Sequence, residues 1–368
     1  MQIFLHAELL KWVTIYIIIY IVPTCNVPSA DNMGNLGTKA AAFAAFSMHS
    51  RTMFHVKHFH RKAPMKKKTK PLRPRRRLVG GIFLLIALLL AGFFGYCFAL
   101  SRVLRVERAT VYLPDLPQSF DGMTVLFVSD LEISGLSSAG EAASLMRRLA
   151  LLKPDVLILG GDYASGSLMD ALNGTRDEAA LSAARQRFFS ALADFPAPMG
   201  KFAVAGEQDA GAAQMEKEMA AGEITLLNNT VGRVSLGGES ISIAGLAPQG
   251  EGILDYSGLS RSFQKGDCVL AVAHNPAAIS AVMTAEAGDS GVWCDLILSG
   301  HTHGGQMIVG KHSMLTLSPQ ETRYPAGWSK ESGVFILVSQ GVGCEIVDLR
   351  LGTEAQVHLI TLRRGLAL

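Results

Sequence analysis

The sequence predicts an α/β domain with mixed strand pairing that follows one membrane-spanning helix. Three observations support this prediction. From residue 124 onward, short β-branched and apolar runs alternate with longer amphipathic segments. An uncharged apolar stretch of bilayer-spanning length occupies residues 78–100. Nearly every short run ends in an aspartate, glutamate or histidine, and the carboxyl ends of strands are where open α/β sheets place their sites.

The segment before the predicted helix is strongly basic. Residues 65–77 carry lysines and arginines and no acid, although the 368 residues have a formal net charge of only +3. Because the apolar stretch 78–100 follows at once, we interpret this run as a topology signal and expect no nucleic-acid partner. Basic residues beside a first membrane helix stay in the cytoplasm, so residues 101–368 are expected to lie outside it.

Residues 1–64 show no pattern that predicts a fold. The apolar run at 12–22 is too short to span a bilayer. Met65 begins a segment of three lysines, further basic residues and an apolar run, which is typical of a complete bacterial N-terminus. We therefore expect residues 1–64 to be disordered or not translated.

The elements of the domain are predicted in chain order from their periodicity. Strands are expected at 124–129, 156–159, 201–205, 233–236, 240–246, 269–273, 296–299, 335–339 and 357–361. Helices are expected at 141–152, 178–195 and 213–220, where apolar side chains recur at helical spacing. Residues 166–178 are predicted to be a long surface loop.

Side chains of ligand type follow five of these strands. They are Asp130, Asp162, Glu207, His274, and His301 with His303. One such residue alone is typical of a helix cap or a structural position, whereas five loops at one sheet edge favour a shared site. His301 and His303 are one residue apart, so extended backbone would direct both imidazoles to one side of a glycine-flanked turn, as metal ligands require.

The ligand-type residues belong to five motifs, in the order Asp130-Leu131-Glu132, Gly161-Asp162, Gly206-Glu207-Gln208-Asp209, His274-Asn275-Pro276 and Gly300-His301-Thr302-His303. These motifs resemble those of the calcineurin-like metallophosphoesterases, and they look closest to the membrane-associated bacterial branch. The resemblance spans residues 114–361. It implies a four-layer sandwich, in which two mixed sheets pack face to face with helices outside. It also implies two divalent ions that share a hydroxide, which attacks phosphorus.

The resemblance also implies a ligand set, position by position. The first metal would be held by Asp130, Glu132, Asp162 and His303. The second would be held by Asp162, which bridges, and by Glu207, His274 and His301. Asp162 and His274 would also serve catalysis, together with Gln208 at the family's acid position.

The chain departs from the family pattern at these motifs. Glu132 stands in place of a histidine, and Glu207 and Gln208 stand in place of an Asn-His pair. Two added carboxylates favour Mn, Mg or Ca over Zn or Fe. Gln208 cannot protonate a leaving alkoxide, and general acid catalysis contributes roughly 10²–10⁴-fold. Gln340 stands where related proteins often carry an arginine that faces phosphate.

Two functions remain open from the sequence. The first is a membrane-anchored metal-dependent phosphoesterase that acts on a phosphorylated small molecule or a lipid head group, with a leaving group good enough to tolerate Gln208. The second is a catalytically impaired relative that binds a metal or ligand in the cell envelope. A purely structural protein would not explain why His274, His301 and His303 occupy ligand positions.

Overall fold

The computed structural model describes residues 74–134, 138–248, 256–310, 312–315 and 317–366. The predictions for residues 1–64 and for most of the basic segment lie outside the described residues. Helix α2 covers Pro74–Ser101. Its segment Leu78–Ser101 is long and apolar enough to cross a membrane, by length and composition, and no part of its most apolar window is buried.

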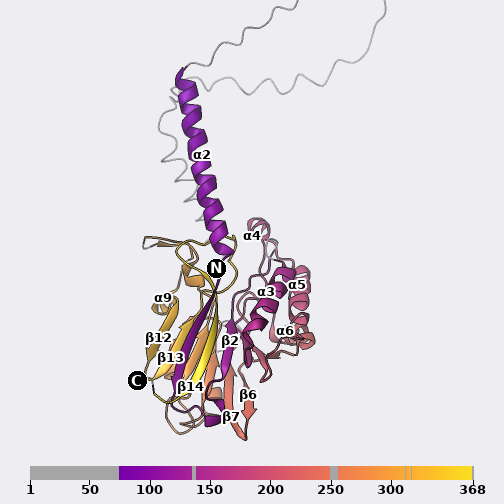
Figure 1. Cartoon of the computed structure of the whole chain (residues 1–368), viewed down its shortest axis with the longest axis vertical. Helices are drawn as coiled ribbons and strands as arrows, with labels where there is room; N and C mark the ends of the chain where they lie inside the picture. The colour runs from indigo at the N-terminus through magenta and orange to yellow at the C-terminus, as the bar shows by residue number, and fades with distance from the viewer. Residues whose placement is uncertain (1–73, 135–137, 249–255, 311, 316, 367–368) are drawn as a thin grey trace, which may run out of the picture. The chain divides into compact units, whose positions relative to one another are not determined.

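The first of two mixed six-stranded sheets combines the first five strands of the domain with the C-terminal strand β14 (Figure 1). Its order is β1-β14-β2-β3-β4-β5, with β14 antiparallel to β2 and the other neighbours parallel. The strands are β1 Leu104–Leu113, β2 Thr124–Val128, β3 Val156–Leu159, β4 Lys201–Ala203, β5 Thr225–Leu226 and β14 Ala355–Arg364.

The second sheet has the order β12-β13-β9-β8-β7-β6, with antiparallel pairs at its two edges and parallel pairs between them. The strands are β6 Thr230–Leu236, β7 Glu239–Gly245, β8 Val269–Val272, β9 Leu296–Ser299, β12 Gly327–Glu331 and β13 Val334–Val338. A separate short hairpin pairs β10 Ile308–Val309 with β11 His312–Ser313.

Helices cover the outer faces of the sheets. The α-helices of the domain are α3 Ala139–Leu149, α4 Leu168–Asn173, α5 Glu178–Ser190, α6 Ala212–Met219, α7 Ser257–Ser260, α8 Ile279–Thr284 and α9 Pro319–Arg323. Single 3-10 turns occupy η2 Gln118–Phe120, η3 Ala150–Leu152, η4 Ala220–Gly222, η5 Pro276–Ala278 and η6 His303–Gly305.

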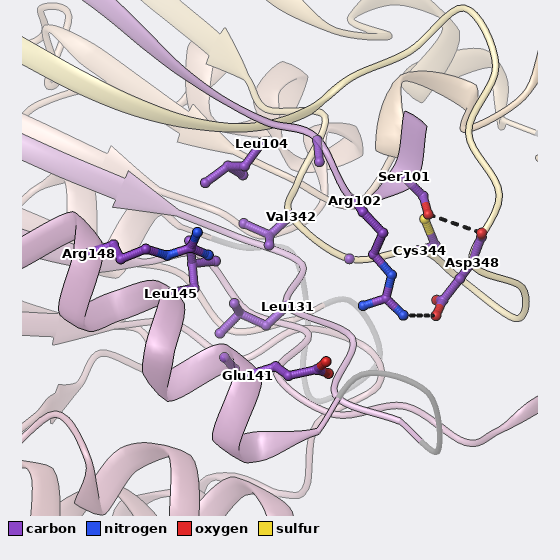
Figure 2. Close-up of a pocket in the computed structure, with 13 residues that line it drawn as sticks. Ser101, Arg102, Leu104, Leu131, Glu141, Leu145, Arg148, Val342, Cys344 and Asp348 are labelled. Atoms are coloured by element: carbon purple, nitrogen blue, oxygen red, sulfur yellow. Dashed lines mark hydrogen bonds and ion pairs between the residues drawn. The ribbon is translucent and has the colours of Figure 1, made fainter. Parts of the chain in front are cut away.

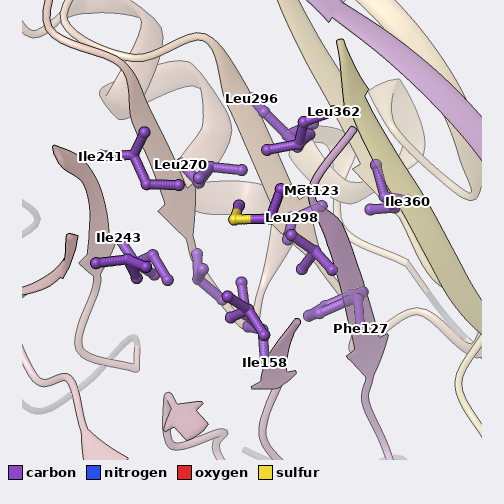
Figure 3. Packing of buried hydrophobic residues seen from close by; sticks show 14 of the residues in the cluster. Met123, Phe127, Ile158, Ile241, Ile243, Leu270, Leu296, Leu298, Ile360 and Leu362 are labelled. Carbon is purple, nitrogen blue, oxygen red and sulfur yellow. The ribbon is translucent and has the colours of Figure 1, made fainter. Parts of the chain in front are cut away.

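Alternating side chains divide the interior into three apolar layers. Phe127 of β2 belongs to the central core between the two sheets, together with Leu298 of β9 (Figure 3). Its neighbour Leu126 points the other way, into the cluster that contains Phe188 of α5. Ile297 of β9 likewise packs into the cluster beneath α8. This period of two in strands buried on both faces confirms the predicted four-layer sandwich.

The differences from the predicted elements have local causes. Helix α3 begins two residues earlier than predicted, because Ser138 and Glu141 form a capping box. The loop predicted at 166–178 contains the helix α4, which a second capping box begins. Strand β1 was not predicted. It lies at the sheet edge, and it alternates charged and half-buried residues until Val111 and Leu113, which are buried.

The C-terminal end of α2 is bonded to the loop after β13 (Figure 2). Ser101 Oγ donates to the Asp348 carbonyl at 3.0 Å, and Arg102 pairs with the Asp348 carboxylate at 3.2 Å. The Arg350 N–H donates to the Cys97 carbonyl at 3.1 Å. A cavity of about 130 Å³ lies beside this junction and is bounded in part by Leu131. The same loop therefore contacts both the helix end and the strand-end motifs.

Candidate metal centre

Five loops carry the predicted site residues, and each loop follows the carboxyl end of a strand. Asp130 follows β2, Asp162 follows β3, Glu207 follows β4, His274 follows β8, and His301 and His303 follow β9. The first three strands belong to one sheet and the last two to the other. The side chains form two groups at the shared edge of both sheets, as the topology of such sheets predicts.

The first cluster consists of Asp130, Glu132 and His303, whose ligand atoms lie within 4.8 Å of one another. His303 Nε2 is 3.7 Å from Asp130 Oδ1 and 3.5 Å from Glu132 Oε1. All three side chains are buried. Among the described residues, Asp130 Oδ2 and both Glu132 carboxylate oxygens have no hydrogen-bond partner. Buried carboxylate oxygens without partners are costly, and a cation would satisfy them.

The second cluster consists of Asp162, Glu207, His274 and His301, again with ligand atoms within 4.8 Å of one another. His274 Nε2 is 2.9 Å from Asp162 Oδ2 and 3.3 Å from Glu207 Oε2. His301 Nδ1 is 3.3 Å from the same Glu207 oxygen. Glu207 and His301 are partly exposed, so this cluster faces the outside more than the first does.

The two clusters adjoin through His274. Its Nε2 lies 3.9 Å from Asp130 Oδ1 of the first cluster, in addition to its contacts within the second. All seven predicted ligand positions are therefore present in the two clusters. Asp162 groups with the second cluster, and its role as a bridge to the first stays a prediction.

The backbone of the clusters is strained. Five of the seven residues have a positive φ: Asp130 at 54°, Glu132 at 48°, Asp162 at 53°, His301 at 70° and His303 at 48°. The left-handed region costs an ordinary side chain about 1–2 kcal/mol per residue. Such strain persists where the surrounding structure enforces it, and it is concentrated at functional sites.

Two glycines permit the close packing around Asp130. A Cβ added at Gly300 would lie 2.4 Å from Asp130 Oδ2. A Cβ added at Gly341 would lie 2.5 Å from Asp130 Cβ, and Gly341 has a φ of +70°. Side chains at either position would displace the carboxylate, so the two glycines fix where Asp130 lies.

Burial and mutual charge shift the titration of both clusters. Burial, with the nearby Asp162 charge, raises the pKa of Glu132 well above its usual value. Burial opposes ionisation of Asp162, but His274 outweighs it and lowers the pKa of Asp162 to about 2. Burial also opposes protonation of His301, yet hydrogen bonds to Glu207 and Glu321 raise its pKa to about 10. The two clusters therefore bring carboxylates and imidazoles close enough for each to shift the titration of the others.

Further residues orient the clusters. Asp209 accepts hydrogen bonds from the N–H groups of Asp162 at 2.8 Å and Gly206 at 2.9 Å. His274 Nδ1 bonds the Gly160 carbonyl at 2.6 Å, which directs Nε2 toward the carboxylates. These supporting roles were not predicted from the sequence, although Asp209 and Gly206 belong to the third motif.

Glu321 is a second supporting residue that the sequence did not indicate. Its Oε1 is 3.3 Å from His301 Nε2 and accepts a hydrogen bond from Asn275 Nδ2 at 3.2 Å. It lies in the short helix α9 as the glutamate of a capping box with Ser318, a pattern that indicates a helix start and no contact with the site. Its contact with His301 fixes the ring that the second cluster uses.

The two divergent glutamines have different environments. Gln208 donates its backbone N–H to Asp162 Oδ1 at 2.8 Å, so it lies beside the second cluster. The Gln340 side chain is instead turned toward Glu354, whose N–H it accepts at 2.8 Å. The Gln340 carbonyl accepts from the buried Arg350. Gln340 thus forms hydrogen bonds within the segment that follows β13.

The donor chemistry of both clusters fits divalent cations, because carboxylate and imidazole groups lie within coordinating distance of one another. Some of the buried carboxylate oxygens also have no hydrogen-bond partner among the described residues. Two mixed sheets with helices outside, and candidate metal clusters at the strand ends, define a metallophosphoesterase domain. Residues 123–305 match the family model of calcineurin-like phosphoesterases, and the chain belongs to that family. The family resemblance of the motifs is thereby confirmed.

Similar proteins occur in bacteria and animals. The chain is 27% identical over 298 residues to the uncharacterized metallophosphoesterase YkuE of Bacillus subtilis, covering 78% of this chain and 97% of that protein. It is 27% identical over 248 residues to the phosphodiesterase YaeI of Escherichia coli, covering 65% of this chain and 81% of that protein. It is 24% identical over 275 residues to a transmembrane protein with metallophosphoesterase domain of Bos taurus, covering 70% of this chain and 57% of that protein.

Proposed function

We propose that this chain is a membrane-anchored metal-dependent phosphoesterase that hydrolyses a phosphate or pyrophosphate ester. The observation that carries the proposal is the pair of adjoining clusters at the strand ends of a calcineurin-like domain. The proposed ligands of the first ion are Asp130, Glu132, Asp162 and His303, and those of the second are Asp162, Glu207, His274 and His301. Divalent ions bound there would lower the pKa of water and neutralise charge on phosphate oxygens.

The chain's own residues then have distinct roles. Asp162 stays ionised at neutral pH, because its neighbours lower its pKa to about 2, and a bridging carboxylate must be charged. His274 is oriented by the Gly160 carbonyl and presents Nε2 to the reacting face. Gln208 lies beside Asp162 and donates its amide to a phosphate oxygen. No proton donor replaces the histidine of the family at this position.

The donor set supports Mn, Mg or Ca over Zn or Fe. Glu132 and Glu207 place two charged carboxylates where the family has a neutral histidine and a neutral asparagine. Hard cations prefer oxygen ligands, and the two extra carboxylates favour ions that bind several oxygen ligands at once. The mixture with three imidazoles makes Mn the best single test ion.

A membrane position is supported by α2 and its junction with the domain. We propose that residues 65–77 stay in the cytoplasm, that 78–100 span the bilayer, and that 101–368 lie outside the cytoplasm. The loop bonded to the end of α2 also contacts Asp130, since the Gly343 N–H donates to the Asp130 carbonyl at 2.6 Å. A site so close to the helix end favours a lipid head group among phosphorylated substrates.

Exposed apolar side chains in the segment that follows Asp162 support the same substrate class. Leu168, Met169 and Leu172 of α4 are 43%, 61% and 54% exposed. They lie in the segment that follows Asp162 along the chain. Apolar surface beside a phosphate-binding site suits a substrate with an acyl or prenyl part.

A catalytically impaired metal- or ligand-binding protein is the second candidate. Two observations favour it: Gln208 replaces the family's acid, and the Gln340 side chain is directed toward Glu354. Such a protein would retain the clusters for binding and would not release a product.

Metal analysis and turnover of the full-length chain in detergent distinguish the two functions. We expect Mn²⁺ to bind and to support hydrolysis of bis-p-nitrophenyl phosphate. Asp162→Ala should abolish turnover, whereas Glu216→Gln, an exposed carboxylate change on α6, should not alter it. Gln208→His should raise turnover of esters with poor leaving groups. Tight metal binding without turnover would support the second candidate, and absence of metal binding would contradict both.

A further inference from the structure

Arg176 contacts the residue that replaces the family's acid. Its Nη1 donates to Gln208 Oε1 at 3.2 Å, and its Nη2 donates to the Gln208 carbonyl. Its Nε pairs with Glu178 at 3.1 Å. The Arg176 side chain is 41% exposed, so it is also accessible to a ligand. Thirty-two residues separate the two partners along the chain.

The backbone that carries Arg176 is held on both sides. Helix α4 ends at Gly174, which has a left-handed φ of 64°, and the Thr175 N–H donates to the Asp170 carbonyl at 2.9 Å. Asp177 then caps α5, because its side chain accepts from the Ala180 N–H. Only Thr175 and Arg176 lie between the two capped ends. The backbone at Arg176 is therefore already ordered, and the contact with Gln208 adds only the cost of ordering the side chain.

The contact with Arg176 determines how Gln208 is oriented. A guanidinium has donors and no acceptor, so the Gln208 oxygen must face it, which leaves the amide N–H groups for another acceptor. The Gln208 backbone is fixed beside the second cluster by its bond to Asp162 Oδ1. An amide donor and a guanidinium thus meet at the residue whose backbone bonds Asp162.

Neither side chain replaces an imidazolium as an acid, because arginine does not deprotonate in proteins and an amide has no labile proton. They suit a leaving group that is already a stable anion. When a pyrophosphate linkage is hydrolysed, the oxygen of one water bonds to the attacked phosphorus and the bond to the bridging oxygen breaks. The electron pair stays on that oxygen, the leaving phosphate departs as an anion, and the water's proton passes to solvent.

We propose that Arg176, paired with Gln208, binds the leaving phosphate and makes the site selective for pyrophosphate-linked substrates. The inference rests on the proposed phosphoesterase function and names its substrate class. Glu178 partly balances the Arg176 charge, but Glu178 also pairs with the buried Arg185 at 2.7 Å. A guanidinium binds phosphate oxygens through paired, charge-assisted hydrogen bonds that a neutral side chain cannot supply.

The test compares two substrates on the full-length chain with Mn²⁺ in detergent. A nucleoside diphosphate sugar has an anionic phosphate leaving group, and bis-p-nitrophenyl phosphate has an aryl one. Arg176→Gln should lower kcat/KM for the first at least tenfold and change the second less than about twofold. Arg176→Lys should recover part of the loss. Arg187→Gln, an exposed arginine change on α5, is the matched control and should leave both rates unchanged.

A binding measurement gives a readout that does not depend on turnover. Calorimetry with methylenediphosphonate, a non-hydrolysable diphosphate, should show at least a tenfold weaker Kd for Arg176→Gln. Equal losses on both substrates would show that Arg176 only holds its loop, and unchanged rates and Kd would also overturn the proposal. If the unaltered chain hydrolyses the aryl diester but not the diphosphate, this inference fails alone. If it hydrolyses neither, the proposed function fails with it.

Discussion

Replacing Glu132 with glutamine should separate metal binding from folding. Burial beside Asp162 raises the pKa of Glu132 well above its usual value, so burial favours the neutral acid over the carboxylate at this position in the metal-free chain. Glutamine has nearly the same shape and is also neutral. We therefore expect Glu132→Gln to leave the thermal midpoint of the metal-free chain within about 2 °C of the unaltered protein, because no buried charge is lost.

The same substitution should remove most of the stabilisation by metal. An ion present at 100 times its Kd stabilises the folded state by about 2.7 kcal/mol. For a domain of this size, each kcal/mol corresponds to about 2–4 °C, so one bound ion should raise the midpoint by about 5–11 °C. In Glu132→Gln an amide replaces the two carboxylate oxygens that have no partner among the described residues. The Mn²⁺-induced shift should fall by half or more.

The assay is differential scanning calorimetry of the full-length chain in detergent, after chelator dialysis and titration with MnCl₂. Glu216→Gln provides the matched control, since it makes the same chemical change on the exposed surface of α6. Glu216→Gln should show the same Mn²⁺-induced rise of the thermal midpoint as the unaltered chain. An equal Mn²⁺ shift in Glu132→Gln and the unaltered chain would refute the assignment of Glu132 as a ligand. A large drop in the metal-free midpoint would refute the neutral state of the carboxyl.

Two further predictions concern residues that support the fold and the site. Burial lowers the pKa of His358 from 6.5 to about 4, so unfolding takes up a proton between these values and stability falls as the pH drops through that window. The loss should be about 2 kcal/mol between pH 7 and pH 5, measured by urea unfolding, and His358→Leu should remove that part of the pH dependence. Gly341→Ala should weaken Mn²⁺ binding at least tenfold by calorimetry, because its Cβ would lie 2.5 Å from Asp130 Cβ in a backbone with φ of +70°. Unchanged affinity would show that Asp130 can shift without loss.

The layers of the fold were predictable because their signals are local. Strands β2 and β9 are largely apolar, buried runs, and a ligand-type residue follows the end of each by two positions. Strand β1 was missed because it is an edge strand whose partner β14 lies about 250 residues further along the chain. Helix α4 was missed because it has only six residues and depends on the capping box of Ser167.

The supporting residues of the site could not be predicted for a different reason. Arg176 and Glu321 act through tertiary contacts with Gln208 and His301, which no spacing in their own segments indicates. The local pattern around Glu321 is a capping box with Ser318, which indicates only where a helix starts. The strained backbone at Asp130 is equally invisible in sequence, because it results from the surrounding loops.

An anomalous difference map from crystals of the full-length chain grown with Mn²⁺ tests the metal centre directly. Two peaks are expected, each within about 2.6 Å of its ligands. One peak should be bounded by Asp130, Glu132 and His303, the other by Glu207, His274 and His301, and the Asp162 carboxylate should lie within reach of both. Manganese bound elsewhere, or no peak at either cluster in crystals that retain Mn²⁺, would contradict the assignment of the two clusters as metal sites.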